Sequence, residues 1–94
     1  MNLSLVASAL RSKDRMRILQ LIGSEQLSSI DVYRRYSSKY SKEKHRESIY
    51  RDLEMLVAAG ILEKKYSVEK KQITYSLKAK EISIELPSGK IVAK

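Results

Sequence analysis

Along the first sixty residues the hydrophobic positions recur every three or four residues, which is the spacing of one face of an α-helix. The first such segment, residues 3–10, follows Asn2, a favoured N-cap residue. The second, residues 13–22, lies between Ser12, another capping residue, and Gly23, which is typical of a helix end. The pattern predicts two short helices.

A third helix begins at a recognisable cap but has no marked end. Ser28 and Asp31 have the spacing of a capping box, and an apolar stripe follows them. The next segment contains neither Gly nor Pro, so two boundaries are open. Either the third helix continues to about Tyr40, or the following helix begins early, near Ser41.

The fourth helical segment, around residues 43–59, is the longest with helical periodicity and ends at Gly60. We expect His45 to lie toward the core at its start. The apolar positions that fall on its inward face are Ile49, Leu53, Leu56 and Val57.

After the fourth helix the hydrophobic period changes to two, which is the period of a β-strand. Alternation on both sides of a polar turn predicts a hairpin over residues 62–78. A second alternating run, 82–86, leads into Pro87 and Gly89, which suit the second and fourth positions of a type I turn. A second hairpin is therefore expected at the end of the chain. Four tyrosines fall on apolar faces and are expected in or beside the core: Tyr33, Tyr36, Tyr66 and Tyr75.

Length and charge narrow the kind of protein. Ninety-four residues are the size of one small domain, and three Gly and one Pro leave no linker-like stretch. Nineteen Lys and Arg against eleven Asp and Glu give a net charge of +8 on a chain that is 43% hydrophobic. A disordered basic tail would be less apolar, so we expect a folded domain whose partner is a polyanion.

The same composition argues against several function classes. Cys is absent and there is one His, so disulfides, thiolate zinc sites and the usual nucleophile–base pairs lack their residues. We expect no enzyme, no cofactor and no metal. No apolar run approaches the roughly 18 residues of a membrane span, and the first residues lack the order of a secretory signal, so we expect no membrane association and a cytoplasmic location.

Three local sequences resemble one family. ALRSKDRMRILQLI resembles the opening helix of ArsR-type winged helix-turn-helix repressors, with Arg15 before an Ile-Leu pair. RESIYRDLEMLVAAGILEKKY is similar to their recognition helix and first wing strand, and KQITYSLKAK to their second wing strand. Together these segments cover roughly residues 9–80.

The resemblance implies an α+β winged helix-turn-helix fold, with three to four helices followed by a β-hairpin wing and a C-terminal β-hairpin. We interpret residues 1–94 as one DNA-binding domain: an N-terminal helix over 1–11, a winged-helix core over 12–80 and the last hairpin over 81–94. Metal-sensing members of the family carry ligand clusters that this chain lacks. Members also commonly dimerise through a C-terminal helix, whereas the end of this chain reads as strands.

The outward face of the fourth helix is the expected DNA-reading surface. A helix of this kind reads base edges with its first turns, where Arg pairs with guanine, Ser donates or accepts and Glu accepts from cytosine. Arg46, Ser48 and Arg51 are the first candidates, and the lysines near this helix and in the wing are expected to meet phosphates. The candidate DNA-binding residues are Lys42, Lys44, Arg46, Glu47, Ser48, Tyr50, Arg51, Lys65, Lys70 and Lys71.

The predicted function is a sequence-specific regulator of transcription, a repressor, that binds double-stranded DNA. The helix around 43–59 would read the major groove and the 62–78 wing would touch phosphates. We expect a homodimer, formed through the 3–10 helix in preference to the last hairpin. Two alternatives stay open: a winged-helix adaptor that binds protein, and an architectural protein that coats DNA without sequence preference.

Overall fold

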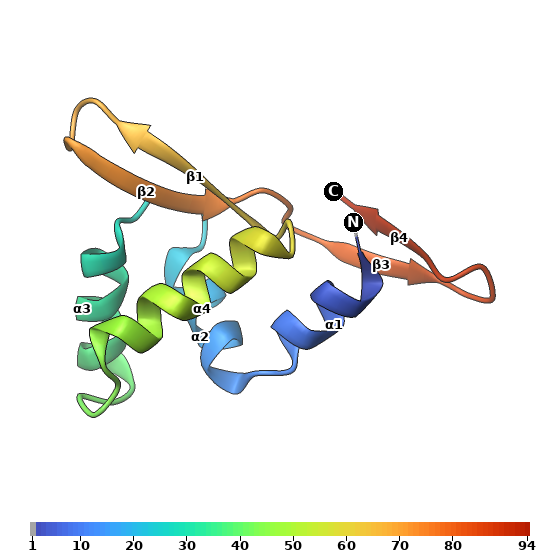
Figure 1. Cartoon of the computed structure of the whole chain (residues 1–94), viewed down its shortest axis with the longest axis horizontal. Helices are drawn as coiled ribbons and strands as arrows, with labels where there is room; N and C mark the ends of the chain where they lie inside the picture. Colours follow the sequence, from blue (N-terminus) through green and yellow to red (C-terminus); the bar gives the residue numbers. More distant parts are fainter. Residues whose placement is uncertain (1) are drawn as a thin grey trace.

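The computed structural model describes residues 2–94, which form four helices followed by two antiparallel β-hairpins (Figure 1). The elements are α1 (Leu3–Leu10), α2 (Lys13–Ile22), α3 (Ser29–Lys39), α4 (Arg46–Ala58), β1 (Leu62–Ser67), β2 (Gln72–Leu77), β3 (Ile82–Glu85) and β4 (Lys90–Ala93). This α+β order confirms the predicted fold class.

The helix starts lie where the capping residues placed them. Asn2 Oδ1 accepts from the Leu5 backbone N–H at 3.1 Å, and Ser12 Oγ accepts from that of Arg15 at 3.3 Å. Ser28 and Asp31 form both bonds of a capping box. Each bond satisfies a backbone N–H that the first turn of a helix leaves without a partner.

The unmarked boundary after α3 is now settled. This helix runs to Lys39 with Tyr40 as its C-cap, which confirms the first of the two alternatives. The prediction that the next helix starts near Ser41, or at about residue 43, is wrong, because α4 begins at Arg46 after a turn. The candidate residues Lys42 and Lys44 therefore lie in that turn and not on the helix.

The core lies between α2, α3, α4 and the base of the first hairpin, which we call the wing (β1 and β2). The inward face of α4 is as predicted, with three aliphatic side chains of zero exposure: Ile49, Leu53 and Leu56. Tyr36 and Tyr75 are also buried, and Tyr33 packs against the core, as expected. Burial of each large apolar side chain contributes about 1.5–3 kcal/mol to folding, so these contacts fix how α4 sits.

The wing is joined to the helices by a pair of backbone bonds that the sequence pattern did not predict. Leu27, between α2 and α3, donates to the Tyr75 carbonyl at 3.0 Å and accepts from the Tyr75 N–H at 2.7 Å. One bridging residue is too short to produce an alternating pattern. The bridge anchors β2 beside the start of α3.

Two residues of the wing are more exposed than expected. Tyr66 pairs with Ile73 across the two strands, on the same face as the buried Tyr75. Tyr66 is nevertheless 63% exposed and Ile73 49%. The expectation of a core position for Tyr66 is wrong, because the strands extend beyond the helices that cover their base (Figure 1).

The last hairpin lies on the α1 side of the molecule, away from the wing tip (Figure 1). β3 and β4 are antiparallel, with Ile84 opposite Ile91. The Gly89 N–H donates to the Glu85 carbonyl at 2.8 Å, so this turn is one residue wider than the predicted type I turn. No helix within residues 2–94 is long and apolar enough to cross a membrane.

Four charged side chains connect α2, the turn before α4, and α4 itself; we call them the ionic cluster (Asp14, Arg15, Lys44 and Asp52). Asp52 lies 3.2 Å from Arg15 NH1 and 2.9 Å from Lys44 Nζ, and Lys44 lies 3.0 Å from Asp14. Three of these side chains are only 13–16% exposed, and Asp14 is 42% exposed. A charge this buried requires its partners, so the cluster fixes α4 against α2.

Hydrogen bonds lower the pKa of the Asp14 carboxyl below its ordinary value of 3.8. The Tyr36 hydroxyl donates to it and is the main cause, and the Lys44 ammonium is the second. The folded chain therefore holds this carboxyl ionised at pH values where the unfolded chain protonates it.

We expect the stabilisation from Asp14 to be complete above pH 3.8 and to disappear as the pH falls through its lowered pKa. Asp14→Asn should reduce the free energy of unfolding at pH 7 and flatten its decrease between pH 5 and pH 3. Urea unfolding followed by circular dichroism measures this, with Glu43→Gln, an exposed carboxyl in the turn, as the control. An acid decrease of equal size in Asp14→Asn and wild type would contradict it.

Candidate nucleic-acid interface

The first two turns of α4 present a mixed, mostly basic face to solvent. Arg46, Glu47, Tyr50 and Arg51 are exposed, while Ser48 is half-buried. They alternate with the buried Ile49, as an amphipathic helix requires. The predicted outward position of Glu47 and Arg51, with Tyr50 at the flank, is thus what the fold produces, whereas Ser48 is only partly exposed.

Lys44 is not part of this face. We expected it to point outward, but its ammonium group lies between the two carboxylates of the ionic cluster, Asp14 and Asp52. It precedes the helix by two residues, so helical periodicity does not describe its direction. Lys42, in the same turn, is exposed.

His45 also differs from the expectation. It is the N-cap residue of α4, makes no capping bond with its side chain and is exposed, so the predicted position toward the core is wrong. The reason is again the later helix start: an N-cap residue has extended backbone dihedrals and lies outside the helical face pattern.

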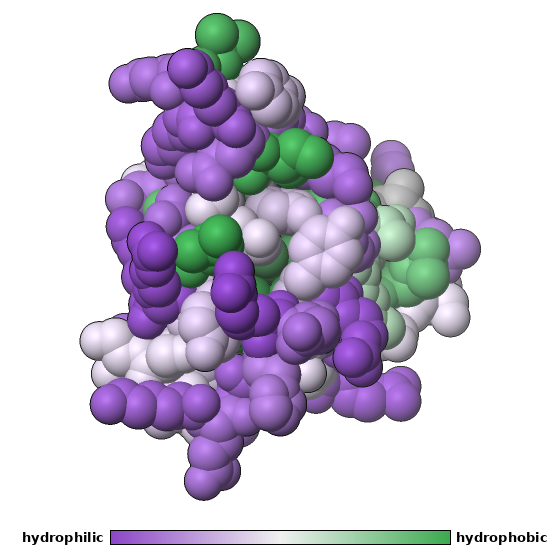
Figure 2. Space-filling view, turned by 60° about the vertical axis from the view of Figure 1, so that its left-hand side comes forward, coloured by the Kyte–Doolittle hydropathy of each residue, from purple (hydrophilic) through white to green (hydrophobic). Residues whose placement is uncertain are grey.

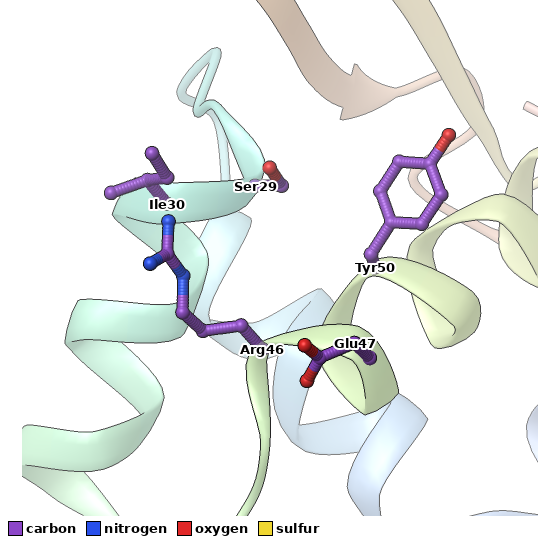
Figure 3. Close-up of a pocket in the computed structure, with 5 residues that line it drawn as sticks. All are labelled: Ser29, Ile30, Arg46, Glu47 and Tyr50. Atoms are coloured by element: carbon purple, nitrogen blue, oxygen red, sulfur yellow. The ribbon is translucent and has the colours of Figure 1, made fainter.

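A hollow lies between the start of α3 and the start of α4, lined by Ser29, Ile30, Arg46, Glu47 and Tyr50 (Figure 3). The Arg46 side chain extends from α4 toward Ile30, and its guanidinium carbon lies 5.8 Å from the centre of the Tyr33 ring. This is a weak cation–π contact at the edge of the hollow, of about 0.5–1 kcal/mol for an exposed pair. Ser29 and Ile30 were not among the residues predicted from the sequence. Hydrophobic periodicity places residues on a face of their own helix, but it does not show that the start of α3 lies beside the start of α4.

The wing places its lysines beside the same surface. Lys65 has a side chain that is 67% exposed, and Lys71 is exposed in the turn with a φ of 56°. Lys70 is exposed as well, but its ammonium donates to the Gln26 carbonyl at 2.9 Å, which holds it near the start of α3. Lys70 is thus tied to the start of α3, whereas Lys65 alternates with Lys64 and points to the face of the wing opposite to the Glu54 contacts.

Glu54 sets the position of the wing relative to α4. It accepts from Lys64 on β1 and from the Tyr75 hydroxyl on β2, both at 2.7 Å. The Lys64 bond lowers the pKa of Glu54, with help from the Tyr75 bond, and burial followed by the bond to Glu54 raises the pKa of Tyr75. A carboxylate on α4 therefore contacts both wing strands.

Figure 2 shows the side of the molecule that carries α3, the start of α4 and the wing. Hydrophilic side chains cover most of it, and a few hydrophobic patches interrupt them in the middle of the face. Among the described residues of this region, the exposed large apolar side chains are Ile30, Tyr50, Tyr66, Ile73 and, in the turn of the wing, Val68. A basic surface with isolated apolar groups is suited to the edges and backbone of a nucleic acid.

Residues 2–94 contain no group of three or more His, Cys, Asp and Glu side chains placed to hold a metal ion.

No model of a known protein family matches the chain, and no curated protein matches it in sequence. Solved structures do match in fold. The ferric uptake regulator of Vibrio cholerae has 18% identity and a TM-score of 0.64, over 95% of this chain and 76% of that one. The Helicobacter pylori regulator has 24% identity and a TM-score of 0.65, over 100% of this chain and 71% of that one.

A third match, the ferric uptake regulator of Francisella tularensis with iron, has 26% identity and a TM-score of 0.61, over 88% of this chain and 66% of that one. The structure from Helicobacter pylori is described as having three functional metal binding sites, which contrasts with the absence of metal expected for this chain. These three are ferric uptake regulators, and a manganese uptake regulator also matches, so the similarity supports a winged helix-turn-helix regulator but not the ArsR type specifically. The chain therefore has the winged-helix fold of transcriptional regulators.

Proposed function

We propose that the protein is a sequence-specific regulator of transcription that binds double-stranded DNA and represses by occupying its operator. The observation that carries this proposal is the exposed, basic first half of α4, held rigidly by its buried aliphatic face and the ionic cluster and flanked by the wing. A helix fixed in this way fits the major groove, where base edges are distinguishable.

Each exposed side chain has a matching chemical role. Arg46 and Arg51 present planar forks for the O6 and N7 acceptors of guanine, and Glu47 accepts from the amino group of cytosine. Ser48 and Tyr50 carry hydroxyl groups that bond a base or a phosphate. The wing lysines Lys65, Lys70 and Lys71 contact phosphates beside the groove.

Selection of bound fragments from random duplexes tests the proposal. At physiological salt we expect a discrete consensus with two-fold symmetry, preferred over bulk DNA by roughly 10³ or more. Arg51→Ala should weaken binding to the consensus by about 1–3 kcal/mol and relax the preference at one base pair. Lys90→Ala, the loss of an exposed charge in the last hairpin, is the control.

Two other results would each replace the proposal. Tight binding without sequence preference would indicate an architectural protein, and weak binding to every duplex would indicate a protein-binding adaptor.

The end of α3 and the turn before α4 are proposed to contact phosphates outside the groove, through Lys39 and Lys42 respectively, both of which are exposed. Replacing both with Ala should lower affinity equally on all sequences. The slope of log K against log salt should become shallower by about 1.8, since each lost contact accounts for roughly 0.9. Fluorescence anisotropy across a salt series measures the slope.

A matched pair, Lys80→Ala with Lys90→Ala, should leave the slope unchanged, because these lysines belong to the far side of the molecule. Lys44→Ala should lower the free energy of unfolding and leave the slope as it is, since its charge is used inside the protein. A slope unaffected by the loss of Lys39 and Lys42 would rule out this contact.

The proposal includes a homodimer formed through α1. Leu3 and Leu5 are 43% and 49% exposed, and they border on either side the face that Val6 and Ala9 bury in the core. One face of α1 thus completes the core, and the apolar side chains at its two borders are left for a second copy to cover. The last hairpin, with Ile84 48% and Leu86 85% exposed, is the competing surface.

We expect the double substitution Leu3→Ser and Leu5→Ser to produce monomers in light scattering, while Ile84→Ser leaves the dimer intact. Both variants change exposed positions, so circular dichroism should show an unaltered fold. The reverse pattern would assign dimerisation to the last hairpin. Neither ArsR-type membership nor a metal response is needed for any of these expectations.

A further inference from the structure

Ile30 is an exposed aliphatic residue on an otherwise polar part of α3. It lies in the first turn and is 36% exposed, while Val32 and Tyr36 supply the buried face of the same helix. A β-branched residue is a poor choice for an exposed helix position on propensity alone. Its exposed part therefore adds an apolar surface that the core does not use.

The surroundings of Ile30 define what it would touch. It lines the hollow at the start of α4, and the Arg46 guanidinium lies next to it (Figure 3). Tyr50, 51% exposed, stands on the other side of the same hollow. An aliphatic group and a guanidinium are thus side by side at one edge of a hollow whose other walls are Ser29, Glu47 and Tyr50.

This pairing has a specific complement in the major groove. Guanine presents two acceptors that a guanidinium bonds with both arms, and a pyrimidine carrying a 5-methyl group presents the one apolar patch available there. When such a pyrimidine is adjacent to the guanine, acceptors and methyl group lie next to each other. The order of chemical groups on the DNA then matches that of Arg46 and Ile30.

The Arg46 guanidinium has a second neighbour on α3, the ring of Tyr33, whose centre lies 5.8 Å from the guanidinium carbon. Arg46 stacks over Tyr33, a residue of α3 that packs against the core. Ile30 belongs to α3, and Arg46 contacts Tyr33 of the same helix. The two side chains are therefore brought together by helices and not by a loop. Restricted side chains lose less entropy on binding, which favours discrimination between bases.

We propose that Ile30 is a specificity-determining residue that contacts the 5-methyl group of a pyrimidine next to the guanine bound by Arg46. The methyl group belongs to thymine or to 5-methylcytosine, which present the same apolar contact. The inference rests on the proposed function and deepens it, because it assigns base reading to α3 as well as to α4.

The test uses the full chain and the duplex obtained by selection. Each thymine is replaced singly by uracil, which removes the methyl group and keeps the base pair. At one thymine beside a guanine in each half-site, we expect affinity to fall about fourfold, the equivalent of about 0.8 kcal/mol for one methyl group removed from water. Replacing that thymine with 5-methylcytosine, paired with guanine, and with unmethylated cytosine shows whether the methyl group is recognised on either base.

The variant Ile30→Ala should bind the thymine and uracil duplexes equally. Met55→Ala, which removes a side chain 39% exposed near the other end of α4, should keep the fourfold difference. Thermal unfolding of both variants confirms that they are folded, as expected for changes at exposed positions.

The possible failures are distinguishable. If selection gives no preferred sequence, the proposed function fails and this inference fails with it. If a consensus exists but no uracil substitution beside a guanine weakens binding, the DNA-reading function stands and the methyl contact is wrong. If the difference persists in Ile30→Ala, another residue reads the methyl group and the assignment to Ile30 is overturned.

Discussion

The contact of Asp52 with Arg15 and Lys44 is the interaction on which the candidate surface depends. It joins the middle of α4 to α2 and to the turn before α4, at a site where the charges are largely removed from water. Arg15 also donates to the Ser8 and Ala9 carbonyls, so the last turn of α1 is included. A buried charge without its partners is strongly destabilising, so these ion pairs favour a single position for the start of α4. The side chains of α4 that do not take part in the ionic cluster remain available for a ligand.

A second charged residue of α4 does the same for the wing. Glu54 accepts from both strands, and the Leu27–Tyr75 bridge fixes β2 beside α3. The helix that carries the candidate reading residues and the hairpin that carries the candidate phosphate contacts are thus held to a common frame. Recognition of a duplex requires this rigidity, because a base-reading helix and a backbone-contacting wing are useful only at a fixed separation.

The sequence predictions are accurate where the interaction is between residues close in the sequence, and they fail where it is between distant segments. Helix starts at Leu3, Lys13 and Ser29 agree because caps are local: a side chain bonds a backbone group three residues away. The core face of α4 agrees because periodicity and burial coincide. Lys44 and His45 differ because no cap or breaker marks the start of α4, and the charge that retains Lys44 comes from Asp14, thirty residues earlier.

The sequence by itself determined the class of protein: four helices, two hairpins, one basic domain and the outward face of the reading helix, all of which follow from hydrophobic period, caps and net charge. Only the tertiary structure decided which cations remain available for a ligand and which neighbours they have. The Lys44 ammonium is paired with carboxylates of the protein itself, and Ile30 of α3 lines the same hollow as Arg46 of α4. The reason is physical: backbone patterns depend on neighbours within a few residues, whereas ion pairing and surface composition depend on which distant segments the core brings together.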